Sequence, residues 1–464
     1  MPAGPTTPST PARRFFPQLE GMRAVAALGV LTTHVAFQTG AVGLPVLGPI
    51  LGRLDLAVAL FFALSGFLLW RPWVASAHGW SNGHRVARAP HPPIRRYLRH
   101  RVVRIWPAYL VVVVVVLTLL PEAQGADATV WLANLTLTQV FVPLSLTAGL
   151  TQMWSLSVEV AFYLLLPLLG LVLFALRGRS VAARIPVLLA LGAVSLSWGW
   201  IAEFLPTPDG VEPTNWVVGH LPWFVAGLIL AEVAGADELG SATRFTRVVA
   251  AIGSRRRSML VVFVIAYGLA CTPIAGPTGL GVLAPWQFAV KMALGAICGF
   301  ALLAPLICSD GTRGIGARFS DRPFPVLTSP PMLALGRWSY GIFIWHVAVL
   351  AVVFGLFGIV PFTGHTAVVW LITAILSIGI AAASYAFVEE PSRDRLRRRE
   401  SRHREELRRQ EESGRDESRR REAARAVRSH RESAGDGESD DGGPGATATS
   451  AEETTLATAT NAGS

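Results

Sequence analysis

Ten stretches of the chain are apolar over a length that can cross a membrane. A hydrocarbon core of about 30 Å takes about 20 helical residues. A chain of 464 residues that is 52% hydrophobic, with a mean hydropathy of +0.45, is not an ordinary soluble protein. The sequence therefore predicts an all-α, polytopic integral membrane protein with about ten transmembrane helices. The predicted spans are 22–39, 56–74, 103–120, 153–176, 185–204, 216–233, 260–271, 286–308, 332–360 and 367–388.

Arginine clusters occur in alternate loops between these spans. Short cytoplasmic loops are enriched in Lys and Arg. Counted from a cytoplasmic N-terminus, the inner loops all contain several Arg, whereas the outer loops contain Arg53 alone together with acidic residues such as Asp127 and Asp209. The alternation predicts that both termini lie in the cytoplasm.

Charge also divides the chain into regions. Sixteen Arg balance sixteen Asp and Glu from Pro391 onward, so the formal charge of +10 belongs to the membrane part and does not indicate a nucleic-acid partner. The mixed Arg/Glu run before about residue 434 is compatible with a solvated helix, and the rest has the composition of disorder. We therefore predict a cytoplasmic segment over 1–18, a membrane domain over 19–391 and a charged, largely disordered cytoplasmic tail over 392–464.

A few ionisable residues lie inside the predicted spans, where each is costly in hydrocarbon and is a functional candidate by default. Lys291 and Arg337 are expected near cytoplasmic ends, from which a long side chain can reach the headgroups. The residues that this does not explain are Arg23, His34, Arg104, Glu159 and His346.

Arg23 and His34 share one stripe of the first span. Eleven residues return to within about 20° of the starting direction and rise roughly 16 Å, so both side chains are expected to face the same cavity. A cation near the cytoplasmic end with an imidazole beyond mid-depth suits a path for an anionic ligand that ends at a proton-handling group.

Two further clusters support such a path. Arg101 and Arg104 are three apart at the start of the third span, and guanidinium groups at this spacing suit a ligand with several phosphates. Glu159 lies within an apolar helix about 10 Å from its outer end and must be paired or protonated. Ser155 is one turn away on the same face, and His34 is the expected partner of Glu159, although Arg23 is an alternative.

The last two clusters come from the final spans. Ser339 and His346 are seven apart and share a stripe, and Glu389 ends the last span just before Pro391. The three cysteines have no CxxC or Cys/His spacing, so neither a disulfide framework nor a metal site is predicted.

Taken together, five motifs in order from Leu19 to Pro391 resemble the membrane acyltransferase 3 family. The first is LEGMRAVAALGVLTTH, with Glu20 where the family more often has Asp; the second places Arg101 and Arg104 before Pro107. The other three are similar to the family's "WSLsvE", "SYglYlwH" and "SYrfiErP" patterns. Their residues here are Trp154, Ser155, Leu156 and Glu159, then Ser339, Tyr340 and His346, then Ser384, Tyr385, Glu389 and Pro391.

The resemblance implies a multi-pass protein of the bacterial plasma membrane that acts as an acyltransferase. It implies acyl-CoA, with acetyl-CoA expected, as co-substrate and no bound cofactor. A carbohydrate or a macrolide-like molecule is implied as acceptor. Because some members carry a fused extracytoplasmic hydrolase-like domain and this sequence ends in a charged tail, we expect it to act on its acceptor directly or to pass the acyl group to a separate extracytoplasmic transferase.

Residue roles follow as a hypothesis. His34 is the expected general base on an acceptor hydroxyl, with Glu159 as its orienter, and an acyl-imidazole on His34 is an alternative. The residues expected to bind acyl-CoA or acceptor are Arg23, Arg101, Arg104, Ser155, Ser339, Tyr340, His346 and Glu389.

Two rival functions fit a membrane protein with buried charges. One is a secondary transporter or exporter, although the sequence shows no internal repeat of the kind that many transporters have. The other is a translocator that delivers acyl groups to a separate transferase. Transfer of a labelled acyl group to an acceptor separates these rivals from the enzyme.

Overall fold

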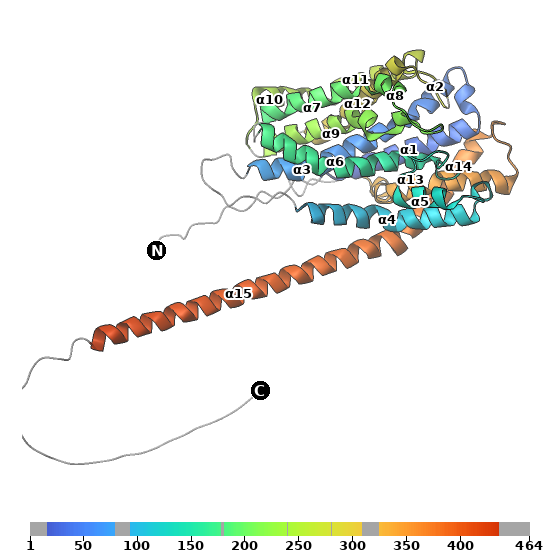
Figure 1. Ribbon diagram of the computed structural model, residues 1–464. Helices are drawn as coiled ribbons and strands as arrows, with labels where there is room; N and C mark the ends of the chain where they lie inside the picture. Colours follow the sequence, from blue (N-terminus) through green and yellow to red (C-terminus); the bar gives the residue numbers. More distant parts are fainter. Residues whose placement is uncertain are drawn as a thin grey trace, which may run out of the picture. The chain divides into compact units, whose positions relative to one another are not determined.

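The computed structural model consists of helices and turns and contains no strand within the residues it describes, which are 16–78, 93–177, 181–238, 240–279, 281–308 and 324–435. The helices of the membrane part are α1 Pro17–Gln38, α2 Leu47–Gly52, α3 Ala57–His78, α4 Ile94–Leu119, α5 Ala128–Thr136, α6 Trp154–Arg177, α7 Val181–Ser195, α8 Trp198–Glu203, α9 Val217–Glu238, α10 Arg244–Gly253, α11 Arg256–Ala270, α12 Pro285–Cys308, α13 Pro330–Phe357 and α14 Thr366–Ser384. The long helices run side by side (Figure 1).

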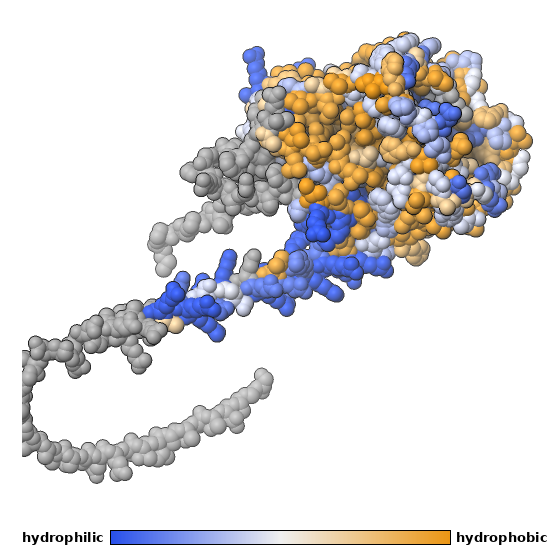
Figure 2. All heavy atoms as spheres, viewed as in Figure 1, coloured by the Kyte–Doolittle hydropathy of each residue, from blue (hydrophilic) through white to orange (hydrophobic). Residues whose placement is uncertain are grey.

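The exterior of this bundle is apolar. Figure 2 shows hydrophobic residues over much of its visible face, and α4, α6, α11 and α14 expose large apolar side chains, among them Val114, Leu164, Val264 and Ile375. Exposed apolar surface on this scale is costly in water and is the surface that lipid covers. The prediction of an all-α membrane protein is confirmed.

Eight helical stretches within the described residues are long and apolar enough to cross a membrane. The two other predicted spans also form helices. The polar residues of α1 lower its mean hydropathy, and α11 has only 15 residues, fewer than the roughly 20 that a full crossing takes. The eight stretches are Leu47–Ala75, Ile94–Leu119, Thr151–Ala175, Ala183–Glu203, Pro213–Glu238, Pro285–Cys308, Pro330–Phe357 and Thr366–Arg425.

One predicted span is broken into two helices. The chain leaves α7 at Ser195 and enters α8 at Trp198, where the Ser197 hydroxyl donates to the Val194 carbonyl at 2.7 Å. Serine side chains that bond their own backbone compete with helical hydrogen bonds, which accounts for the interruption.

The charged region after the bundle is helical as far as it is described. A π-turn at Tyr385–Glu389 leads into α15, Glu390–Gly435, and i,i+4 pairs such as Arg409–Glu405 at 2.7 Å line this helix. The helix contains the Arg/Glu run for which the sequence allowed a solvated helix. Residues 1–15 of the predicted N-terminal segment, the loops at 79–92 and 309–323, and residues 436–464 of the predicted tail lie outside the described residues.

Contacts between α3 and α9 set the spacing at the centre of the bundle. A Cβ atom on Gly227 would lie 1.9 Å from the Ala63 carbonyl oxygen, and one on Gly66 would lie 2.4 Å from the Phe224 carbonyl oxygen. Because only glycine leaves room at these positions, the two backbones approach closely, as small residues allow in membrane helices.

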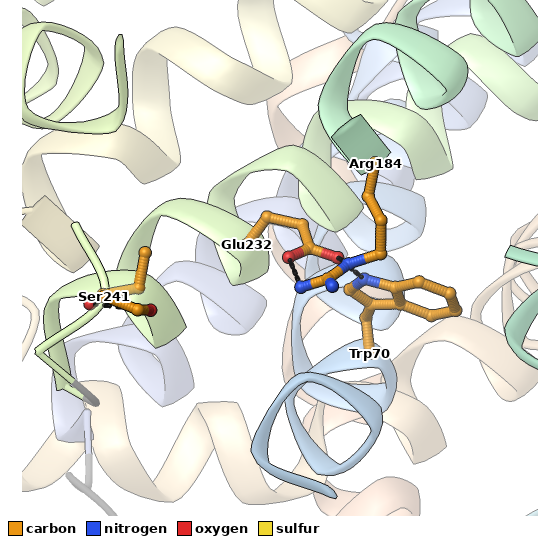
Figure 3. Close-up of polar contacts among 5 residues, drawn as sticks. Trp70, Arg184, Glu232 and Ser241 are labelled. Atoms are coloured by element: carbon orange, nitrogen blue, oxygen red, sulfur yellow. Dashed lines mark hydrogen bonds and ion pairs between the residues drawn. The ribbon is translucent and has the colours of Figure 1, made fainter. Parts of the chain in front are cut away.

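A buried ion pair joins α7 to α9. The Arg184 guanidinium donates to both carboxylate oxygens of Glu232, at 2.8 and 2.7 Å, and the Trp70 indole nitrogen donates to the same carboxylate at 2.9 Å (Figure 3). Both charged side chains are fully buried. The bidentate geometry satisfies charges that would otherwise be very costly inside the bundle.

A second ion pair corrects the expectation for Lys291. Its ammonium lies 2.6 Å from a carboxylate oxygen of Asp55, just before α3 begins. Arg53 nearby is buried and donates to the Gly276 carbonyl at 2.6 Å. Lys291 therefore neutralises an acid of another segment, and the prediction that it reaches the headgroups at a cytoplasmic end was wrong.

We predict that Gly227→Ala lowers the stability of the bundle. The added methyl overlaps the Ala63 carbonyl, and overpacking of this kind costs about 1–3 kcal/mol. The midpoint of thermal unfolding in detergent should fall. Gly268→Ala in α11 is the control, because nothing lies within 4 Å of the position that its Cβ would take. Equal midpoints for the two variants would contradict the close approach of α3 and α9.

We predict that Glu232→Leu strongly reduces the yield of folded protein, because it leaves Arg184 buried and unpaired at a cost of about 3–5 kcal/mol. The double variant Arg184→Leu/Glu232→Leu should recover part of that yield. The matched control is Glu238→Leu, whose partner Arg71 lies 2.9 Å away at a partly exposed site, where a pair contributes about 0–1 kcal/mol. Yield is measured by fluorescence-detected size exclusion. A double variant that is no better than Glu232→Leu would show that the charge pair is not the reason.

Candidate active site

One cavity inside the bundle brings together most of the residues that the sequence singles out. It lies between α1, α3, α4, α6 and α13 and contains about 60 Å³ of space for water-sized spheres, enough for about five waters. The lining residues are Arg23, Val58, Phe61, Phe62, Leu64, Ser65, Leu68, Leu69, Arg101, Arg104, Ile105, Ser155, Leu156, Glu159, Tyr163, Ser339, Tyr340 and Phe343.

The cavity carries more positive than negative charge. Arg23, Arg101 and Arg104 line it, and Glu159 is the one acid among its lining residues. Within the described part of the chain, the Nε atoms of Arg23 and Arg101 are buried without a hydrogen-bond partner. Buried guanidinium groups in such surplus call for an anion, and the planar fork of Arg suits phosphate oxygens.

Glu159 is held by neighbours that differ from those expected. The Ser65 hydroxyl donates to its Oε1 atom at 2.5 Å and the Tyr163 hydroxyl donates to the same atom at 2.6 Å. The predicted pairing of Glu159 with His34 is therefore absent from the described contacts. Glu159 shares the cavity with Arg23, which was the alternative partner.

His34 instead contacts His346. The Nδ1 atom of His34 lies 3.2 Å from Nε2 of His346, and the ring centroids are 5.0 Å apart. Each Nδ1 atom also faces a backbone carbonyl, that of Val30 at 2.9 Å for His34 and that of Phe343 at 2.7 Å for His346.

These contacts assign the tautomers of the pair. A carbonyl oxygen can only accept, so each Nδ1 carries a proton and His346 Nε2 is an acceptor. The remaining lone pair of His34 is then on Nε2, and the side chain is half-buried. This nitrogen is suited to take a proton from a hydroxyl group.

The histidine pair and the cavity are separate. Arg23 lines the cavity, whereas neither His34 nor His346 is among its lining residues, so the expectation that Arg23 and His34 face one cavity was wrong. The helical stripe gives both side chains the same direction, yet roughly 16 Å separates them along α1, more than so small a cavity spans. Phe343, one turn before His346 on α13, lines the cavity and lies 6.0 Å from the His346 ring.

Other predicted residues fall on both sides of this division. The Tyr340 hydroxyl donates to the Ile105 carbonyl at 2.8 Å, which ties α13 to α4 beside the arginines. Ser155 and Ser339 line the cavity, and the Ser155 hydroxyl donates to the Gln152 carbonyl at 3.1 Å. Glu389 is not a lining residue; it is buried in the π-turn, and its Oε1 atom has no partner within the described residues.

Three lining residues were missed by the sequence analysis. Ser65 holds Glu159, and Phe61 and Phe343 close part of the cavity. Ser65 is a polar residue in the apolar run FFALSGFLLW and could have been noticed there, but only ionisable groups were weighed. The aromatic rings carry no signal that separates them from ordinary packing residues. Among the described residues, no group of three or more His, Cys, Asp or Glu side chains is placed to hold a metal ion.

Comparisons with known proteins agree with the architecture. A family model described as an acyltransferase domain matches residues 16–388. The chain is 23% identical over 402 residues to the O-acetyltransferase OatA of Staphylococcus aureus (strain NCTC 8325 / PS 47), which covers 82% of this chain and 57% of that protein. It is 22% identical over 401 residues to the peptidoglycan O-acetyltransferase OatA of Listeria monocytogenes, with coverages of 82% and 56%.

A shorter match has higher identity. The chain is 32% identical over 170 residues to the acyltransferase MdmB of Streptomyces mycarofaciens, which covers 33% of this chain and 38% of that protein. The chain thus spans little more than half the length of the OatA proteins that it matches. No solved structure matches it significantly.

The family match, the relatives and the membrane-spanning helices describe a multi-pass bacterial membrane protein with acyltransferase activity. Because the family model covers four-fifths of the sequence, from the first residue of the described bundle into its π-turn, this chain belongs to the acyltransferase family that the model defines.

Proposed function

We propose that the protein moves an acyl group, with acetyl expected, from cytoplasmic acyl-CoA to a hydroxyl of a carbohydrate or of a glycosylated, macrolide-like acceptor. The observation that carries the proposal is the cavity with three guanidinium groups and one carboxylate. In our proposal both termini face the cytoplasm, so the Arg-rich start of α4 meets the donor.

The size of the cavity decides which part of the donor it receives. About 60 Å³ has no room for a nucleotide but accepts a slender chain. The phosphates of CoA therefore bind Arg101 and Arg104 at the cytoplasmic end of α4, with Arg23 on the facing helix, and the pantetheine arm extends into the cavity. Bidentate contacts to phosphate make arginine the suitable residue for this role.

In the chemical step, His34 Nε2 takes the proton of the acceptor hydroxyl while the oxygen attacks the thioester carbonyl. The bond from the carbonyl carbon to sulfur breaks, and the CoA thiolate leaves and receives the proton from the imidazolium. His346 holds the His34 ring through Nδ1. An acyl-imidazole on His34, later transferred to the acceptor, is the covalent alternative.

Glu159 has a different role from an orienter of His34. With Ser65 and Tyr163 as its donors, it sits among the arginines and offsets part of their mutual repulsion when the donor is absent. It then acts with Arg23 on the donor. This is the alternative that the sequence left open.

The acceptor assignment draws on the relatives. Two carry the name O-acetyltransferase OatA, one of them with peptidoglycan in its name, and the third is named acyltransferase MdmB. We propose a cell-envelope carbohydrate reached directly or through a separate extracytoplasmic transferase. The rival functions, transporter and acyl-group translocator, predict movement of acyl groups without their attachment to an acceptor by this chain.

We predict that His34→Ala lowers acyl transfer by about 10²–10⁴-fold, the usual contribution of positioned proton transfer. Membranes containing the protein are incubated with acetyl-CoA labelled in the acetyl group, and label in carbohydrate and release of free CoA are both measured. His403→Ala is the matched control, because that side chain is exposed in α15.

Retained transfer by membrane-inserted His34→Ala protein would rule out this role of His34. Transport of label without release of CoA thiol would favour a transporter. Release of CoA with label passed on only when a second protein is present would favour the translocator.

We predict that Arg101→Ala and Arg104→Ala each raise the KM for acetyl-CoA about tenfold or more, since a hydrogen bond to a charged group contributes about 1.5–3 kcal/mol. The maximal rate should change less. Arg95→Ala is the control, because Arg95 is exposed at the start of α4 and does not line the cavity. An unchanged dependence on donor concentration in both cavity variants would contradict the phosphate role.

A further inference from the structure

Two aromatic rings lie where the cavity comes closest to the histidine pair. Phe61 of α3 and Phe343 of α13 both line the cavity, and their ring centroids are 6.0 Å apart at an interplanar angle of 67°. Neither belongs to a motif that the sequence analysis used. We call these two residues the aromatic pair.

The order of residues along α13 places the aromatic pair at the histidine end of the cavity. Ser339, Tyr340 and Phe343 line the cavity in succession, and His346 is one turn further along the same helix. The Phe343 ring lies 6.0 Å from the His346 ring. Phe343 is thus the last cavity residue on this helix before the histidines.

The other helices agree with this order. On α1 the single lining residue is Arg23, and His34 lies roughly 16 Å further along the axis. The Thr33 hydroxyl beside His34 donates to the Gly52 carbonyl at 2.9 Å, so His34 is at the level of the turn that precedes α3. Phe61 is nine residues beyond that turn and therefore lies between His34 and the arginines.

We propose that the aromatic pair is a constriction between the donor cavity and the histidine pair, and that it determines which acyl groups reach His34. This inference rests on the proposed donor, acyl-CoA. A thioester whose phosphates bind the arginines must pass its acyl end between Phe61 and Phe343. The constriction passes an acetyl group and excludes longer chains.

Packing around the two rings indicates which one moves. Phe62 also lines the cavity, but it is stacked on Phe224 at 4.4 Å and 11°, and Phe224 is stacked on Phe162 at 3.8 Å. Phe61 is half-buried, whereas Phe343 is buried. Phe61 therefore has more freedom to change rotamer, and its edge-to-face contact with Phe343 is the one that opens.

The test compares acyl-CoA donors within each variant. Rates of CoA thiol release that depend on His34 are measured with acetyl-CoA, butyryl-CoA and hexanoyl-CoA in membranes that contain the native acceptor. The ratio of the hexanoyl to the acetyl specificity constant does not depend on how much of a variant is folded. Pockets that exclude extra methylenes discriminate by about 10–200-fold. We therefore expect Phe61→Ala to raise this ratio at least tenfold and Phe61→Trp to lower it.

Two controls make the result specific to the position. Phe263→Ala removes a half-buried ring of α11 that is stacked on Tyr267, away from the cavity, and should leave the ratio unchanged. Leu68→Ala enlarges the same cavity two turns further along α3 and should change the ratio by less than threefold.

Each outcome has a distinct meaning. Normal acetyl transfer with an unchanged ratio in Phe61→Ala, or an equal rise in Leu68→Ala, overturns the constriction and leaves the proposed function intact. A wild-type protein that releases CoA from none of the three donors overturns the proposed donor and this inference with it.

Discussion

The cost of an ionisable side chain inside an apolar helix bundle is the constraint on which the rest of this structure depends. Such a group must be paired, neutralised or held at a cavity that can receive a counter-ion. Arg184 and Glu232 meet the requirement within the protein through two hydrogen bonds, and Trp70 supplies a third. The arginines of the cavity do not meet it, since a single acid stands among them. That imbalance is the physical reason to assign them an anionic ligand.

The site has two compartments with different chemistry. One holds charge and is lined by α1, α3, α4, α6 and α13, and the other is the neutral imidazole pair of α1 and α13. Backbone carbonyls hold the protons of that pair on Nδ1, which leaves Nε2 of His34 as the base. Placing the base away from the arginines keeps it out of their field, which would oppose formation of an imidazolium.

Much of the arrangement could be predicted from the sequence because ionisable residues are rare in spans. Arg23, Arg104 and Glu159 were noticed for their charge, and all three line one cavity. The partner of Glu159 was predicted wrongly, as was the surroundings of Lys291. In both cases the charge was recognised but the neighbour lay on another helix, Ser65 for Glu159 and Asp55 for Lys291. Phe61 and Phe343 could not have been found, because an aromatic residue in an apolar run is ordinary.

The sequence by itself determined the helical membrane architecture and the direction in which each polar side chain points, since length, hydropathy and a period of 3.6 residues act within one helix. Only the tertiary structure decided the depth at which each helix lies beside its neighbours. Close backbone contacts such as those at Gly66 and Gly227 determine that depth, and they depend on the shapes of two surfaces at once. For that reason His34 meets His346 across a helix interface while Arg23, on the same stripe, faces the cavity.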